Sequence, residues 1–188
     1  PSLWAIGTSA GTDITNTATA TYNSGTATGL TEDSNPVTTT VNELLDVSVL
    51  WQDTSNIIVS PGDTNQVLTF LITNTGNGSD TYSLSGLSTL TGDQFDPTLV
   101  DIFLDANDNG VYDSGTYTLY APGVNDPVLD ANDPLTNDLA VFVVNDIPSP
   151  LVDADLGNSQ LTATSTLASG TDAPGTVLGS GAGDMSTE

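Results

Sequence analysis

Apolar and polar residues alternate strictly in two stretches of the N-terminal half. From Ile14 to Tyr22 the sequence reads ITNTATATY, which puts mostly small apolar residues on one face and a row of threonines on the other. The alternation returns with bulkier residues from Leu45 to Trp51. Because side chains of a β-strand point to opposite faces in turn, both stretches are predicted to be strands with one face packed against protein.

Two further stretches, 66–73 (QVLTFLIT) and 139–144 (LAVFVV), are apolar on both faces, as in the central strands of a sheet. The Asn- and Gly-rich sequence 74–79 follows the first of them and predicts a hairpin turn. Strands this short and closely spaced predict an all-β protein, a two-sheet sandwich of about eight to ten strands. The remaining strands are expected at 37–41, 56–59, 81–84, 99–104, 116–120 and 161–165.

The texture of the chain divides it into three parts. Residues 1–43 are expected to form an extended arm, with a strand at 12–22, a turn-rich stretch and a second strand at 36–42. Residues 44–168 are expected to form the sandwich, and 169–188 a Gly/Ser-rich tail with at most a short edge strand at 176–178. Since two such light strands cannot make a core, the arm must pack either on its own sandwich or on a neighbouring copy.

The charge of the chain is one-sided, with 24 acidic residues, no Lys, Arg or His, and a formal net charge of −24. No side chain can neutralise a phosphate, which excludes nucleic-acid binding in practice. No apolar run approaches the roughly 18–20 residues of a membrane span, so no membrane insertion is expected. The preference for Asp over Glu favours a calcium-loaded extracellular protein, and a halophilic origin is an alternative. Intrinsic disorder is a third explanation, which the clean alternation argues against.

The residue types needed for most enzyme chemistry are missing. The chain has no Cys and no His, which excludes disulfides, thiol catalysis and ordinary zinc sites. A Ser or Thr nucleophile would find no His or Lys as its base. Pairs of carboxylates, as glycosidases use, arise by chance in so acidic a chain, and no aromatic-rich cleft is evident. The sequence therefore predicts a protein that is not an enzyme.

One segment, DANDNGVYD, has the spacing of a calcium loop. Oxygen-bearing side chains stand at loop positions 1, 3, 5 and 9, a glycine at position 6 allows the sharp turn, and a backbone carbonyl serves position 7. The predicted ligands of a structural Ca²⁺ ion are Asp105, Asn107, Asn109, the carbonyl of Val111, and Asp113.

The predicted loop, 105–116, departs from a full EF-hand in its last position. Thr116 stands where a bidentate Glu would complete the site, so Asp101, Asp126 and Asp130 are candidates for the missing ligands. The alternative is an Asx-rich hairpin that binds no metal.

Several segments resemble the DUF11, or conserved-repeat, domains of large bacterial surface proteins. The resemblance is carried by 10–22 (AGTDITNTATATY), 34–41 (SNPVTTTV), 70–77 (FLITNTGN), 143–148 (VVNDIP) and 173–177 (APGTV). It implies an immunoglobulin-like sandwich that is exported to the cell surface and has no known catalysis. Those proteins are usually long arrays of repeats, whereas this chain contains one unit.

A single surface unit is useful mainly if it polymerises, and the arm has the features of a donated strand. An extracellular filament subunit, similar to pilins or biofilm-matrix fibres, would bind copies of itself by inserting the face formed by Ile14, Asn16, Ala18, Ala20 and Tyr22. The alternatives are a monomeric cell-surface adhesin or carbohydrate-binding module with structural calcium, and a surface-layer protein.

Asn77-Gly78-Ser79 is either an N-glycosylation sequon or an ordinary turn.

Overall fold

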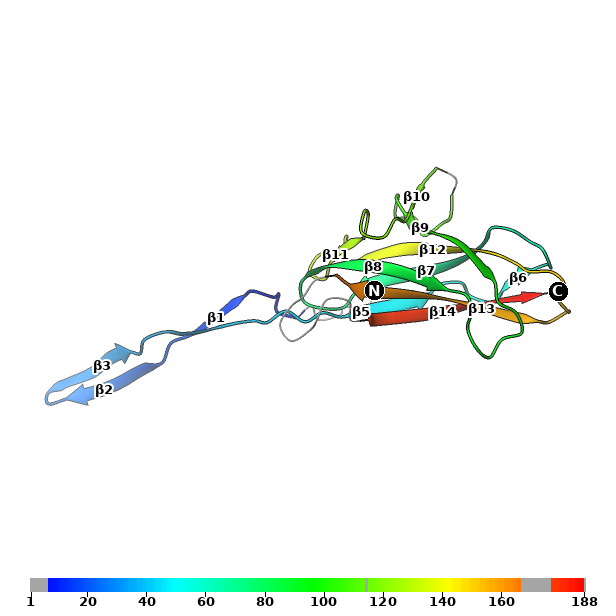
Figure 1. Cartoon of the computed structure of the whole chain (residues 1–188). Helices are drawn as coiled ribbons and strands as arrows, with labels where there is room; N and C mark the ends of the chain where they lie inside the picture. Colours follow the sequence, from blue (N-terminus) through cyan, green and yellow to red (C-terminus); the bar gives the residue numbers. More distant parts are fainter. Residues whose placement is uncertain (1–6, 114, 167–176, 188) are drawn as a thin grey trace.

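The computed structural model describes residues 7–113, 115–166 and 177–187, and in these residues it contains strands and no helix, so none that could cross a bilayer. Ten described strands form two packed five-stranded sheets, which confirms the predicted two-sheet sandwich (Figure 1). The first sheet has the order β10 (Tyr117–Leu119), β9 (Thr98–Asp105), β12 (Asp138–Asp146), β7 (Gln66–Asn74) and β5 (Val47–Trp51). The second has the order β11 (Val128–Asp130), β8 (Ser79–Leu87), β13 (Leu156–Ser165), β14 (Val177–Thr187) and β6 (Ile57–Val59).

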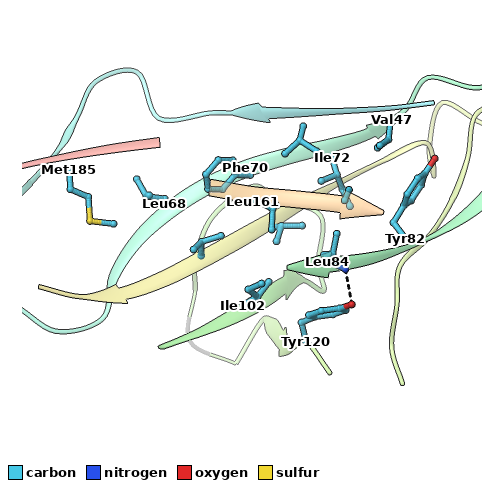
Figure 2. Close-up of a cluster of buried hydrophobic side chains, with 14 of the residues drawn as sticks. Val47, Leu68, Phe70, Ile72, Tyr82, Leu84, Ile102, Tyr120, Leu161 and Met185 are labelled. Carbon is cyan, nitrogen blue, oxygen red and sulfur yellow. Dashed lines mark hydrogen bonds between the residues drawn. The ribbon is translucent and has the colours of Figure 1, made fainter. Parts of the chain in front are cut away.

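The core lies between the sheets and follows the alternation of the sequence. Leu68, Phe70 and Ile72 of β7 are fully buried and meet Leu161 of β13 and Met185 of β14 (Figure 2). The two stretches predicted to be central, 66–73 and 139–144, form β7 and β12, which pair in the interior of the first sheet. β12 is buried on both faces, as expected for an inner strand, whereas the outward-facing residues of β7 are half-buried.

Most connections in the sandwich pass from one sheet to the other. Among the sandwich strands described, only β9–β10 and β13–β14 are neighbours in both sequence and sheet. The hairpin predicted at 74–79 is wrong, because β7 and β8 belong to different sheets. Its Asn and Gly residues make a tight crossover turn whose backbone approaches another segment closely, a use that the local signal does not distinguish from a hairpin.

The predicted tail is also wrong for residues 177–187, which form β14, an inner strand between β13 and β6; residues 169–176 and 188 lie outside the described residues. Composition misled here because β14 is rich in glycine. At Gly183 a side chain is excluded by the indole of Trp51, so this glycine serves packing in a regular strand. The short strand β11 was not predicted either.

Residues 13–40 form a two-stranded ribbon that projects from one end of the sandwich (Figure 1). The ribbon consists of β1 (Asp13–Asn16) paired with β4 (Val37–Thr40), followed by β2 (Thr19–Ser24) paired with β3 (Ala27–Asp33). The single strand predicted at 12–22 is therefore divided in two, and the stretch predicted as turns contains β3. Every residue from 11 to 40 is exposed, so the ribbon does not fold back onto its own sandwich.

Candidate functional site

The ribbon is the most extensive exposed feature with distinctive chemistry. Residues 14–31 are the longest run without a charged residue in this acidic chain, bounded by Asp13 and Glu32. Large apolar side chains along the ribbon are exposed to solvent, with Ile14 54% and Tyr22 48% exposed. An isolated two-stranded ribbon is marginally stable in water, and exposed apolar side chains gathered along one segment are a common feature of interaction surfaces.

Cross-strand contacts hold the ribbon in register without a core. The hydroxyls of Thr15 and Thr38 are 3.0 Å apart, and the Thr40 hydroxyl donates to Asp13 Oδ1 at 2.6 Å. Ala18 lies in the gap between β1 and β2, where its N–H donates to Ser34 Oγ at 3.0 Å. The face predicted for strand donation lies wholly on the ribbon, and each of its residues is exposed; its role in an interface stays a prediction. Its members are Ile14, Asn16, Ala18, Ala20 and Tyr22.

Asn77, in the crossover turn between β7 and β8, joins both legs of the ribbon to the sandwich. Its Nδ2 donates to the carbonyl of Asn42 at 3.0 Å and to that of Thr8 at 3.3 Å, while its Oδ1 accepts the N–H of Leu44 at 2.7 Å. Its carbonyl also accepts the N–H of Ala10 at 2.8 Å. One side chain thus bonds to the chain entering the ribbon and to the chain leaving it.

The glycines on either side of Asn77 make this junction possible. A Cβ on Gly76 would meet the carbonyl oxygen of Leu44, and one on Gly78 would be 2.8 Å from Glu43 Oε1. The turn therefore requires glycine at position 76, where the close atom belongs to the backbone, whereas the Glu43 side chain could move away from a side chain at position 78. Because the Asn77 amide nitrogen already donates two hydrogen bonds, attaching a glycan to it would remove one of them, which favours the ordinary-turn interpretation of the sequon.

The predicted calcium loop connects β9 and β10, and its oxygen atoms face its own backbone. Asp105, 4% exposed, accepts the N–H groups of Asn107 and Asp108 on Oδ1 and that of Gly110 on Oδ2 at 2.7 Å. Asn109 Oδ1 accepts the N–H of Val111 at 2.8 Å. Asn109 Nδ2 donates to Asp113 Oδ2 at 3.2 Å, and the Val111 carbonyl accepts the N–H of Asp113 at 2.9 Å.

These atoms are hard oxygen donors of the kind Ca²⁺ prefers, and Gly110 has the positive φ (71°) that the turn requires. The described residues nevertheless contain no group of three acidic side chains placed to hold a metal. The observed hydrogen bonds equally suit a metal-free Asx-rich hairpin. Calcium binding by this loop therefore stays a prediction.

The three supplementary ligands do not converge on the loop through any hydrogen bond in the described structure. Asp126 accepts the Tyr120 hydroxyl at 2.6 Å and Asp130 accepts the N–H of Asn132 at 2.9 Å. Asp101 lies exposed on β9, opposite Val144.

Two acidic residues that the sequence did not single out as ligands lie beside Asp105 instead. Asp108 and Asp138 line, together with Asp105, an open groove of about 430 Å³. Burial, and secondarily the charge of Asp108, raises the pKa of Asp138.

An aromatic cluster anchors the same loop to the outer face of the first sheet. Tyr112 stacks on Tyr117 with ring centroids 4.3 Å apart, and its ring centroid lies 5.3 Å from that of Phe142 and 5.7 Å from that of Phe103. Partial burial and the neighbouring Tyr117 hydroxyl raise the pKa of Tyr112 to about 12. Tyr112 lies inside the predicted calcium loop, so any change in the loop moves a residue that covers the sheet. The spacing of aromatics was the only sequence signal for this cluster.

Asp80 is a buried carboxylate in a chain that has no cationic side chain to pair with it. It is 1% exposed, its Oδ1 accepts the Thr81 N–H at 2.6 Å and the Ser165 hydroxyl at 2.9 Å, and its Oδ2 has no hydrogen-bond partner among the described residues. Burial, with a smaller contribution from Glu43, raises the pKa of Asp80. The fold therefore holds Asp80 at a cost in free energy near neutral pH.

The sequence matches no protein-family model and no curated protein. Among solved structures, the chain is similar to a family 123 glycoside hydrolase from Clostridium perfringens described for glycolipid glycan hydrolysis, with 12% identity and a TM-score of 0.35 over 76% of this chain and 26% of that one. It is also similar to the ASH/PapD-like domain 7 of human CEP192, with 10% identity and a TM-score of 0.27 over 77% of this chain and 83% of that one. The chain thus spans about a quarter of the hydrolase, and TM-scores this low carry no functional argument.

Proposed function

We propose that this protein is an extracellular, non-enzymatic structural subunit that polymerises into a filament through its N-terminal ribbon. The observation that carries the proposal is the ribbon itself, whose uncharged residues 14–31 are all exposed. Sequence alone suggested a single donated strand. Because β1 pairs with β4 and β2 with β3, the proposed donor is a two-stranded ribbon, and residues 14–22, from β1 through Ala18 to β2, carry the predicted face.

Electrostatics supports self-association through residues 14–31, the longest uncharged run of the sequence. Two copies with a net charge of −24 each repel when their acidic surfaces approach. Residues 14–31 bring no carboxylate of their own into a contact, which limits both the repulsion and the cost of burying a charge. The paired strand β3 adds Glu32 and Asp33, which lie opposite Ala20 and Thr19.

The junction at Asn77 supports a defined geometry for the polymer. Since Asn77 bonds to Thr8 and Asn42 on the two legs, it restrains the direction in which the ribbon leaves the sandwich. A restrained donor loses less conformational entropy on binding than a free tail. Identical ribbons that project in one fixed direction generate an open, repeating, head-to-tail contact.

Calcium is the second part of the proposal, assigned to the loop 105–116 on the spacing of Asp105, Asn107, Asn109, Val111 and Asp113. A bound divalent cation would offset part of the carboxylate repulsion around the groove at Asp108 and Asp138.

The proposal is tested by deleting the ribbon at its base, where the two legs are already hydrogen-bonded to each other. Thr12 and Val41 are already hydrogen-bonded across the ribbon base (Val41 N–H to Thr12 O, 2.8 Å), so residues 13–40 can be replaced by an Asn-Gly turn. By negative-stain electron microscopy and sedimentation, the full chain is expected to form uniform fibres and the deletion variant a folded monomer.

Three outcomes contradict the proposal. Fibres from the deletion variant would assign assembly to another surface. A full chain that stays monodisperse in calcium would overturn polymerisation and favour the monomeric adhesin or carbohydrate-binding module, while flat lattices would indicate a surface-layer protein. Circular dichroism of the deletion variant is the control that its sandwich, 44–187, remains folded.

A further inference from the structure

The two lateral sides of the sandwich differ in how their sheet edges are covered. On the side formed by β10 and β11, the segment 120–127 accepts hydrogen bonds from backbone N–H groups of β8. The N–H of Leu84 donates to the Tyr120 hydroxyl at 2.8 Å (Figure 2), and the N–H of Tyr82 donates to the carbonyl of Pro127 at 2.9 Å. The N–H of Tyr120 in turn donates to the carbonyl of Ile102 at 2.9 Å. This side is closed.

The opposite side, formed by β5 and β14, is open. The short strand β6 pairs only with Met185–Thr187, so residues 177–184 of β14 have β13 as their one partner strand in the described structure. A β-sheet edge of this length is a template for pairing with another chain.

The register of β5 shows which of its backbone groups are unpaired. The Thr75 N–H donates to the Asp46 carbonyl and the Gln52 N–H to the Thr69 carbonyl, which fixes the phase of the ladder with β7. Because hydrogen bonding alternates along an antiparallel strand, the N–H and C=O groups of the intervening residues face away from β7. These residues are Val47, Val49 and Trp51, and no described residue bonds to those groups.

The open side also lacks the charges that usually protect an edge. Neither β5 nor residues 177–183 contain an acidic residue. The nearest acid in the β5–β6 segment, Asp53, is already bonded to Trp51 Nε1 at 2.7 Å and to the Thr69 N–H at 2.9 Å. The closed side, in contrast, carries the acidic groove with Asp105, Asp108 and Asp138.

We infer that the open side, β5 with residues 177–184 of β14, is the acceptor for the ribbon of a second copy of this chain, an inference that rests on the proposed function. Residues 14–31 of the donor, and β5 and residues 177–183 of the acceptor, are uncharged in a chain of net charge −24, while Glu32 and Asp33 end the donor strand β3 and Asp184 ends the acceptor stretch. Donor and acceptor each offer unpaired β-strand backbone to the other. The donor strands β2 and β3 have six and seven residues, which matches a five-residue β5 and an eight-residue stretch of β14.

The arrangement of the chain gives this pairing a direction. The ribbon leaves the sandwich roughly along the axis in which the sandwich strands run (Figure 1). A second copy displaced along that axis therefore places its strands beside the ribbon. Donor and acceptor are different surfaces, so the contact is heterologous and does not close on itself, which yields a filament.

The first test compares one added negative charge on the open side with one on the closed side. Leu50 of β5 is 57% exposed and Val128 of β11 is 62% exposed, so Leu50→Asp and Val128→Asp are matched in charge and exposure. Leu50→Asp is expected to raise the concentration needed for assembly at least about tenfold, the effect of about 1.4 kcal/mol per contact, whereas Val128→Asp leaves it unchanged. Equal effects, or an effect of Val128→Asp alone, overturn the inference.

The second test uses the absence of cysteine from the chain. Copies with Leu50→Cys are mixed with copies that carry a single cysteine at Thr19, Ala20, Thr21 or Tyr22, and disulfide-linked dimers are expected for one or two neighbouring positions. Val128→Cys is the matched control. Fibres that cross-link through Val128→Cys and never through Leu50→Cys overturn the acceptor and leave the proposed function standing. Absence of fibres from the unmodified chain overturns both.

Discussion

Trp51 lies directly against the backbone of Gly183. A Cβ added to Gly183 would be 2.8 Å from both Cδ1 and Nε1 of the indole, closer than real Cβ contacts come, and 3.2 Å from Leu68 Cδ2. Trp51 belongs to the first sheet and Gly183 to the second, so this contact joins the two sheets along their open side. The indole N–H remains bonded to Asp53 Oδ2 at 2.7 Å, which leaves the ring little freedom to move away.

Gly183→Ala is therefore expected to lower the free energy of unfolding by about 1–3 kcal/mol, the usual cost of overpacking a core. Chemical denaturation followed by circular dichroism measures it. In a Trp51→Phe background the smaller ring should relieve the clash, so the effect of Gly183→Ala should shrink in the double-mutant cycle. An equal cost in both backgrounds would show that Trp51 is not what requires the glycine.

Asn77→Ala is expected to loosen the base of the ribbon. The variant removes the acceptor of the Leu44 N–H and the two hydrogen bonds that the Asn77 amide donates to Thr8 and Asn42. The free energy that protects the Leu44 amide from hydrogen exchange should therefore fall by about 1–3 kcal/mol. Amide exchange measured by nuclear magnetic resonance checks this. Ser79→Ala is the control, because it also destroys the sequon and leaves the Asn77 side chain in place. Unchanged protection at Leu44 would contradict the role assigned to Asn77.

Asp80→Asn is expected to stabilise the protein at neutral pH and to make its folding stability less dependent on pH. The pKa of Asp80 is raised in the fold, so the folded state binds its proton more tightly than the unfolded state. Its contribution to stability is fully present below the unfolded pKa of about 3.9 and is lost as pH rises through the folded pKa. Melting temperatures of the native protein and the variant should thus converge in acid and diverge near neutrality.

The exposed Asp153 provides the control for that experiment. Asp153→Asn removes the same charge from the surface, and should shift the melting temperature little at any pH. If Asp153→Asn stabilises the neutral protein as much as Asp80→Asn, then relief of general charge repulsion, and not of the buried carboxylate, explains the effect.

Asp113→Asn is expected to weaken calcium binding about tenfold or more, because it removes a charged oxygen ligand from the predicted loop. Isothermal titration calorimetry measures the affinity. Near-ultraviolet circular dichroism reports on Tyr112, which the aromatic cluster places against Tyr117. Asp133→Asn, outside the loop, should bind calcium as the native protein does. If the native protein shows no calcium-dependent heat or dichroism change, the loop is a metal-free hairpin.

The strands could be predicted from the sequence because alternation is a local property. Each inward residue from Leu45 to Val49 and from Leu68 to Ile72 is buried as the period of two requires. The candidate loop at 105–113 could likewise be found from spacing alone, since its ligands are close in sequence. The sequence by itself thus determined the fold class, the inner strands β7 and β12, and the candidate chemistry.

Only the tertiary structure decided which strands share a sheet and what the glycines and asparagines do. The turn at Asn77 reads locally as a hairpin, yet its bonds reach Thr8 and Asn42, distant in sequence. Gly183 reads as part of a loose tail until Trp51 is placed against it. The physical reason is common to both cases. Where two segments distant in sequence approach closely, a small residue is required, but the sequence around that residue does not identify the segment that packs against it.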